Sequence, residues 1–224
     1  MRDHRDSLGS VQTIRAGDVN WMTAGRGIVH SERTPAAARV RGATVHGLQL
    51  WLGLPRAHEE TAPAFHHYEG ATLPVVRPPG ATVRVLAGEA FGARSPVATL
   101  SPLVYLDVAL EPGATVELPA ALGERGVYLT GGDVTCAGRP FAPGRMLVLA
   151  PRATAHVSSA GGARFVVVGG QPFPEPRHLW WNFASSSEER LEQAKRDWRD
   201  RRGDPGGPFP LVPGDADEFI PLPE

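Results

Sequence analysis

The sequence is poor in cysteine, because Cys136 is the single cysteine among 224 residues. One cysteine excludes a disulfide within the chain and agrees with a reducing compartment, so we expect a cytoplasmic protein. An excess of either charge is also lacking, since 23 Lys and Arg residues stand against 24 Asp and Glu residues. This balance gives no general attraction to phosphate backbones or anionic lipids, and we therefore expect no nucleic-acid partner.

Long hydrophobic runs are absent as well. No stretch of about 18 apolar residues suggests a membrane helix, and the N-terminal segment MRDHRDSLGS lacks the apolar centre of a signal peptide. We therefore expect no membrane association. Glycine and proline are abundant instead, with 26 and 22 residues spread between short apolar segments, as is typical of turns between strands.

Short β-branched or apolar segments, each closed by Gly, Pro or Asp, recur from residue 8 to residue 170. This spacing predicts an all-β sandwich or barrel. In the segment TVHGLQLWLGL, every second side chain from His46 to Leu52 would point to one face of a strand, and we expect that face to lie toward a core. The predicted strands are 10–14, 44–54, 82–88, 103–110, 126–132, 145–150 and 163–170.

The pattern changes after residue 184. In SSSEERLEQAKRDWRD (185–200), serines precede acidic residues, and Leu191, Ala194 and Trp198 recur at helical spacing. These features predict one amphipathic helix. The remaining residues, from 203 onward, are rich in Pro and Gly, so we expect a tail that runs over the surface without regular structure.

His30 and Glu32 stand two positions apart in the segment GDVNWMTAGRGIVHSERTP (17–35). On a strand both side chains would project from the same face, where an imidazole and a carboxylate could bind one ion. Such mixed ligation suits Fe(II), Mn(II), Zn(II) or Ni(II), but a transition-metal site needs about three or four protein donors. The alternative is a surface strand that carries two polar side chains.

Several motifs resemble those of the bacterial pirin family, and they span the chain from its first residues to its last. They include WMTAGRGIVHSE, HGLQLW, YLDVALEPGA (105–114) and WWNFASSSEERLEQAKRDW (180–198). Pirins are bicupins, with two cupin β-barrels in tandem, so the resemblance implies an all-β bicupin with a C-terminal helix and an extended tail. The expected domains are 1–62 for the remainder of the N-terminal cupin, 63–184 for the C-terminal cupin, and 185–224 for the helix and tail.

The resemblance also implies a metal site. In pirins the N-terminal cupin binds one iron through three histidines and one glutamate, and the motif spelled GIVHSE here supplies two of these ligands. His30 and Glu32 are thus expected to bind Fe(II). The family's other two ligands come from a His-Pro-His-Arg-Gly motif that this sequence does not contain.

Two explanations of the missing motif are open. The reading frame is assigned from an internal methionine, or the chain is a truncated paralogue that has lost its site. We expect the first, because a barrel without its opening strands exposes an apolar face and unpaired edges.

The other histidines do not supply the missing donors. We expect His4 to be a solvated turn residue near the terminus and His46 to be a hydrogen-bonded core residue. His66 and His67 are neighbours, so their side chains should point in opposite directions. His156 has no second donor two positions away.

The function implied by the resemblance is that of an iron-dependent dioxygenase of the quercetin 2,3-dioxygenase type. Glu32 would be the catalytic residue that takes a proton from a flavonol-like substrate, while the metal organises the substrate and dioxygen. The alternative is a metal- or redox-responsive regulatory protein that binds a protein partner without turnover. With two of four ligands, the chain as given is expected to bind metal weakly and to show no oxygenase activity.

Overall fold

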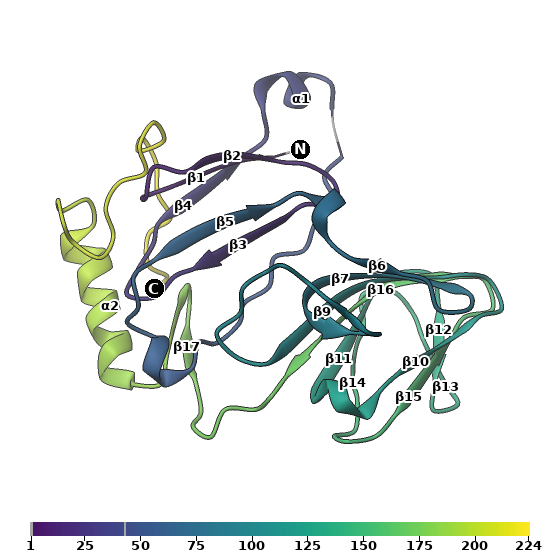
Figure 1. The fold of residues 1–224 in the computed structure, drawn as a ribbon. Helices are drawn as coiled ribbons and strands as arrows, with labels where there is room; N and C mark the ends of the chain where they lie inside the picture. The colour runs from purple at the N-terminus through teal and green to yellow at the C-terminus, as the bar shows by residue number, and fades with distance from the viewer. Residues whose placement is uncertain (1, 43) are drawn as a thin grey trace. The chain divides into compact units, whose positions relative to one another are not determined.

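The computed structural model describes residues 2–42 and 44–224, and it confirms the predicted all-β class (Figure 1). The chain forms two compact units, one of Met1–Gly70 with Phe173–Glu224 and one of Ala71–Pro172. The first unit thus combines the N-terminal strands with the C-terminal helix and tail. Within the described part of the chain, no helix is long and apolar enough to cross a membrane.

The unit Ala71–Pro172 consists of two antiparallel sheets around an apolar core. Its strands alternate between buried and more exposed residues, as in β9, where Val104, Leu106, Val108 and Leu110 are buried. Phe165 of β16 is fully buried in the same core. One sheet has the order β14-β11-β16-β9-β7-β6, with β8 also paired to β7, and the other has the order β10-β15-β12-β13.

Five of the eleven strands in this unit fall on predicted segments, and the other six were not predicted. The strands are β6 Val75–Val76, β7 Ala81–Ala90, β8 Ala93–Arg94, β9 Leu103–Leu110, β10 Thr115–Leu118, β11 Glu124–Gly131, β12 Val134–Cys136, β13 Arg139–Phe141, β14 Met146–Val148, β15 Ala155–Ser158 and β16 Ala163–Gly170. Short 3-10 turns lie at η2 Gly70–Thr72 and η3 Ala120–Leu122. Every predicted strand between residues 82 and 170 therefore falls on an observed strand.

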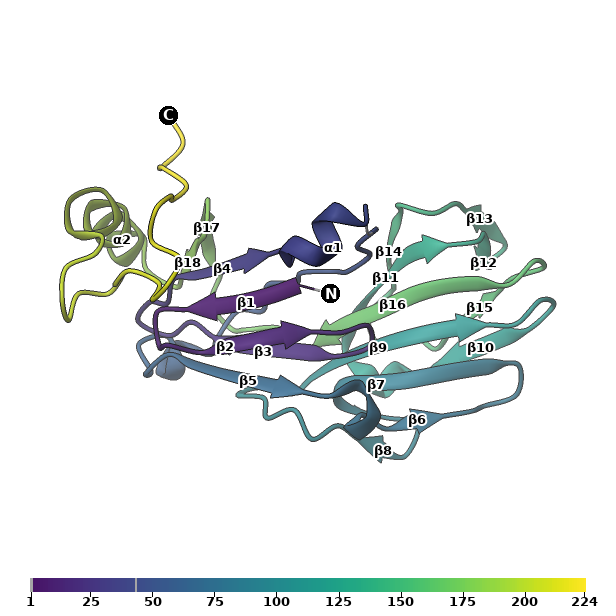
Figure 2. The same cartoon turned by 90° about the horizontal axis from the view of Figure 1, so that it is seen from above.

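The other unit contains a three-stranded sheet with the order β2-β1-β4 and the strand pairs β3-β5 and β17-β18, which Figure 2 shows from above. His4 of β1 stacks on Phe65 of β5 with ring centroids 4.2 Å apart, so these two layers meet through their inner side chains. The elements are β1 Arg2–Asp6, β2 Val11–Ile14, β3 Val19–Thr23, β4 His30–Arg33, α1 Ala36–Val40, η1 Arg56–His58, β5 Ala64–Tyr68, β17 His178–Trp180, β18 Phe183–Ser185 and α2 Glu188–Arg201.

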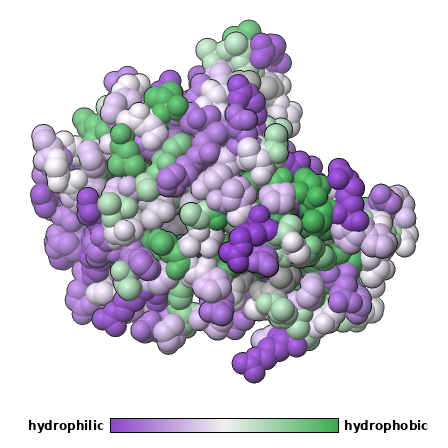
Figure 3. Space-filling model, in the orientation of Figure 1, coloured by the Kyte–Doolittle hydropathy of each residue, from purple (hydrophilic) through white to green (hydrophobic). Residues whose placement is uncertain are grey.

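The segment 44–54, expected to be a strand, has no regular structure, and the expectation of a buried His46 is also wrong. His46 is exposed, and the large apolar residues nearby are between 37% and 53% exposed. Alternation of side chains defines two faces, but a strand also needs a neighbour for its amides and carbonyls, and none of the described strands pairs with this segment. Exposed apolar residues, green in Figure 3, lie among hydrophilic ones on the face shown there.

The predicted C-terminal helix is confirmed as α2. Ser187 caps it by accepting a hydrogen bond from the amide of Arg190, and acidic residues occupy its first turn and arginines its last. The tail beyond α2 has no helix or strand, as predicted, but it is not confined to the surface. Phe209 and Val212 are buried, and the Phe209 ring lies 5.4 Å from that of Trp198.

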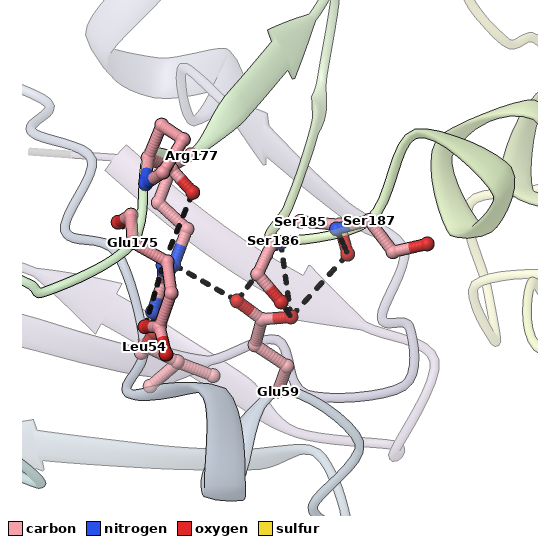
Figure 4. Close-up of polar contacts among 8 residues, drawn as sticks. Leu54, Glu59, Glu175, Arg177, Ser185, Ser186 and Ser187 are labelled. Carbon is pink, nitrogen blue, oxygen red and sulfur yellow. Dashed lines mark hydrogen bonds and ion pairs between the residues drawn. The ribbon is translucent and has the colours of Figure 1, made fainter.

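A partly buried polar network joins the end of η1 to the segment before α2 (Figure 4). The carboxylate of Glu59 accepts hydrogen bonds from the amide and hydroxyl of Ser186 at 3.0 and 2.8 Å and from the hydroxyl of Ser185. It also forms an ion pair with Arg177 at 2.8 Å, while Arg177 donates to the carbonyl of Leu54. We call Glu59, Arg177, Ser185 and Ser186 the Glu59 clasp.

Candidate functional site

Strand β4 carries both predicted metal ligands and pairs with β1. In the antiparallel register, His30 lies opposite Asp6 and Glu32 lies opposite His4. Opposite residues of such a pair project to the same face, and so do residues two positions apart on one strand. The four side chains therefore share one face of the sheet. The spacing of His30 and Glu32 predicted their common face, and the register adds two further ionisable groups to it.

His4 is buried, with 2% of its surface exposed, so the expectation of a solvated turn residue is wrong. Its Nε2 lies 3.1 Å from Oδ2 of Asp6. The ring stacks on Phe65, and its centroid lies 5.7 Å from that of His30. The physical reason is that β1 runs between β2 and β4, so alternate residues of RDHRD point inward although none of them is apolar.

Asp6 is fully buried and accepts three hydrogen bonds. Its Oδ1 accepts from the amides of Leu8 and Ser10 at 2.9 and 3.0 Å, and its Oδ2 meets His4. Burial alone would raise the pKa of this carboxyl, but the hydrogen bonds from His4, Ser10 and Leu8 together hold the pKa below its usual value. Asp6 is therefore an interior carboxylate that closes the turn after β1 and orients His4.

His30 is half-buried, whereas Glu32 lies more in contact with solvent. Burial lowers the pKa of His30, and the neighbouring His4 lowers it further, against the opposing charges of Glu32 and Asp6. The neutral imidazole favoured in this way is the form that binds metals. The carboxylate of Glu32 lies 3.5 Å from the guanidinium of Arg2, and its side chain is 32% exposed.

Within residues 2–42 and 44–224, no group of three or more His, Cys, Asp or Glu side chains is arranged to hold a metal ion. His30 and Glu32 have donor atoms of the right kind for Fe(II) or Ni(II), and they share a face. His4 directs its Nε2 toward Asp6 rather than toward this pair. Two donors do not fit a complete centre, which needs about three or four.

The β3-β5 pair carries His67, which the sequence analysis named, and Asn20, which it missed. Asn20 and His67 are paired across it, with Nδ1 of His67 lying 2.7 Å from Oδ1 of Asn20. Both share the face of Phe65, which meets His4. The buried atoms Asn20 Nδ2 and His67 Nε2 have no hydrogen-bond partner. His66 is exposed, so these neighbouring histidines do point in opposite directions, as predicted.

The opposite face of β4 is held by the C-terminal tail. Arg33 donates to both carboxylate oxygens of Asp215, at 2.8 Å each, and also to Glu218, while Ser31 donates to Asp215 at 2.6 Å. Hydrogen bonds from Arg33 and Ser31 lower the pKa of Asp215 to about 2. Hydrogen bonds to Asp215 and Glu218 raise the pKa of Arg33. The strand with the predicted ligands is thus anchored by the last residues of the chain.

Comparisons with known proteins agree with this fold. The family model described as Pirin matches residues 1–52, and the one described as Pirin C-terminal cupin domain matches residues 105–204. A pirin-like protein of Caulobacter vibrioides is 45% identical over 222 residues, which are 99% of this chain and 74% of that protein.

Two solved structures extend the comparison. A crystal structure of quercetin 2,3-dioxygenase from Acinetobacter baumannii has a TM-score of 0.85 at 30% identity and covers 100% of this chain and 72% of that one. A bacterial pirin from Escherichia coli in complex with nickel(II) has a TM-score of 0.55 at 17% identity, over 76% of this chain and 68% of that one, a likeness of fold alone. The predicted bicupin class is confirmed.

Proposed function

The chain belongs to the pirin family, and from this premise we propose that it carries an incomplete form of the metal site of a quercetin 2,3-dioxygenase-type enzyme, which acts on an aromatic, flavonol-like substrate. The observation that carries the proposal is the pairing of an imidazole and a carboxylate, His30 and Glu32, on one face of β4. Iron would supply dioxygen chemistry in such an enzyme, and His30 and Glu32 are the two ligands that this chain contributes.

Glu32 is the residue that we propose to act on the substrate. Its side chain is 32% exposed and close to Arg2, so a small molecule can approach the carboxylate. A carboxylate within hydrogen-bond reach of an acidic hydroxyl can take its proton, which is general base catalysis.

Metal binding by the two ligands is tested first with Ni(II), which is paramagnetic in octahedral sites and broadens nearby resonances even when it binds weakly. For the chain of 224 residues we expect weak binding, with broadening centred on β4 and no stoichiometric retention after dialysis. His30→Ala and Glu32→Gln should each abolish the broadening. His156→Ala is the matched control, because His156 is an exposed histidine of the other unit. Equal broadening in all variants would exclude His30 and Glu32 as ligands.

Activity is tested with quercetin as the probe. With two metal donors, we expect no measurable consumption of quercetin under air by the 224-residue chain in the presence of Fe(II). Tight binding of one iron per chain, or turnover at a rate that His30→Ala does not change, would contradict the proposed role of the two ligands.

A second candidate function is a metal- or redox-responsive interaction protein without turnover. The observation in its favour is that the segment 44–54 carries several exposed large apolar residues, because exposed apolar side chains often contact another protein. Binding of a protein partner that Trp51→Ser weakens, together with a lack of quercetin turnover, would favour this candidate over the enzyme.

A further inference from the structure

Two buried ionisable side chains beside His30 have no role in the proposed function. Asp6 is 0% exposed and His4 is 2% exposed, and both lie on the face of the β1-β4 pair that carries His30 and Glu32. Burying such groups costs free energy unless hydrogen bonds compensate. Packing alone therefore does not explain why Asp6 and His4 are buried at this face.

The two oxygens of Asp6 have different partners. Oδ1 accepts from the amides of Leu8 and Ser10 and so holds the turn between β1 and β2. Oδ2 lies 3.1 Å from Nε2 of His4, and a carboxylate in this position favours the imidazole tautomer that carries its proton on Nε2. One oxygen thus serves the backbone, and the other fixes the ring of His4.

The ring of His4 in turn contacts two other rings. It stacks on Phe65 with an interplanar angle of 9°, and it is stacked with His30 at an angle of 21° and a centroid distance of 5.7 Å. His4 therefore cannot rotate freely, and its flat side limits the rotation of the His30 imidazole. Ordering a side chain before it binds removes an entropy cost from the binding step.

We propose that the His4–Asp6 pair is a positioning device for His30. Asp6 fixes the plane and tautomer of His4, and His4 fixes the plane of the His30 imidazole. His4 is a positioning residue and not a ligand. The consequence for metal binding rests on the proposed function, whereas the orientation of His30 does not and can be measured without metal.

The substitution Asp6→Asn separates this role from turn formation. Asparagine keeps a carbonyl oxygen for the amides of Leu8 and Ser10, but its amide group replaces the acceptor that faces His4 with a donor. His4 must then change its tautomer or its plane. The matched control is Asp3→Asn on the same strand, because Asp3 lies on the opposite face and contacts Thr13.

The experiment is a long-range ¹H–¹⁵N correlation of the histidine rings in the metal-free, full chain. In Asp6→Asn we expect a change of tautomer at His4, altered or exchange-broadened ring signals of His30, and unchanged amide signals of Leu8 and Ser10. His4→Phe keeps an aromatic ring without its nitrogen atoms, and it should also alter His30. Asp3→Asn should leave both histidines unchanged.

Two results would overturn the proposal. One is an unchanged His30 ring in Asp6→Asn despite a new tautomer of His4. The other is a shift of the Leu8 and Ser10 amide signals as large as the change in the His30 ring signals. That result would mean that Asp6 only stabilises the turn. With Ni(II) added, Asp6→Asn should weaken binding about 10-fold. Absence of Ni(II) broadening at His30 in the unaltered chain would defeat the proposed function but not the positioning role.

Discussion

Arg33 and Asp215 form a two-pronged contact, in which Nε and Nη2 of the guanidinium each lie 2.8 Å from a different carboxylate oxygen. This planar arrangement is the geometry in which arginine binds carboxylates most strongly. It connects β4 to a tail that contains no helix or strand. The tail is therefore part of the folded unit, although its sequence predicts no regular structure.

The contribution of Asp215 to stability should depend on pH. The folded protein lowers the pKa of Asp215 from 3.8 to about 2, so unfolding takes up a proton between these values. The contribution is fully present above about pH 4 and is lost as the pH falls through 2. Urea unfolding of the unaltered chain and of Asp215→Asn at several pH values should show a difference that is largest near neutrality and shrinks over this window. A difference independent of pH would contradict the assignment.

Tyr105 should titrate above the usual pKa of a tyrosine. Burial and, secondly, the nearby charge of Asp107 raise the pKa of Tyr105 from 10.0 to about 12. Because the unfolded chain loses this proton first, Tyr105 contributes stability below pH 10 that is lost as the pH rises toward 12. Ultraviolet titration of the chain should show a component near pH 12 that is missing in Tyr105→Phe. Retention of that component in the variant would assign it to another tyrosine.

The Glu59 clasp should contribute more to the free energy of unfolding than an exposed ion pair does. The side chains of Glu59 and Arg177 are 14% and 11% exposed, so Glu59→Gln removes the nearer countercharge of a largely buried Arg177 and leaves it only Glu175, at 4.0 Å. We expect a loss of about 2 kcal/mol in the free energy of unfolding. Glu60→Gln is the matched control, because it breaks an ion pair with Arg190 in which Glu60 is 59% exposed, and it should cost less than about 1 kcal/mol. Equal losses would show that burial of the clasp does not matter.

Gly88 should not tolerate alanine. Its φ of +78° is unfavourable for other residues, and a Cβ at this position would collide with the carbonyl of Leu103. Gly92 has a similar φ of +75° but open space around it. We expect Gly92→Ala to cost about 1 kcal/mol and Gly88→Ala to cost several times more, as measured by urea unfolding. Similar losses for both would mean that the backbone at Gly88 moves to accept the methyl group.

The sequence predicted five of the eleven strands of the unit Ala71–Pro172, among them the four longest, because the pattern of these strands is local. In β9, alternation and flanking turns are sufficient, since the predicted segment 103–110 coincides with the strand Leu103–Leu110. The segment 44–54 has the same alternation but lacks a strand partner, which no local pattern can reveal.

The candidate site shows the same difference between local and non-local signals. The spacing of His30 and Glu32 predicted their shared face, and the resemblance supplied the metal hypothesis. His4 was missed because RDHRD has no apolar residue to mark it as an inner strand, although His4 and Asp6 do stand two positions apart. The contact of Arg33 with Asp215 depends on the folded path of the tail, for which the sequence has no periodic signal.

The two faces of β4 have a consequence for local unfolding. One face carries His30 and Glu32, and the other is held by Asp215 through Ser31 and Arg33. A strand of four residues that loses one set of contacts opens more often, so its amides exchange with solvent faster. Cleavage of the chain after Val212 would detach Asp215 from β4, and it should therefore also disturb His30 and Glu32 on the opposite face, although the tail does not contact that face. We thus expect the tail to prolong the time for which the two predicted ligands stay aligned.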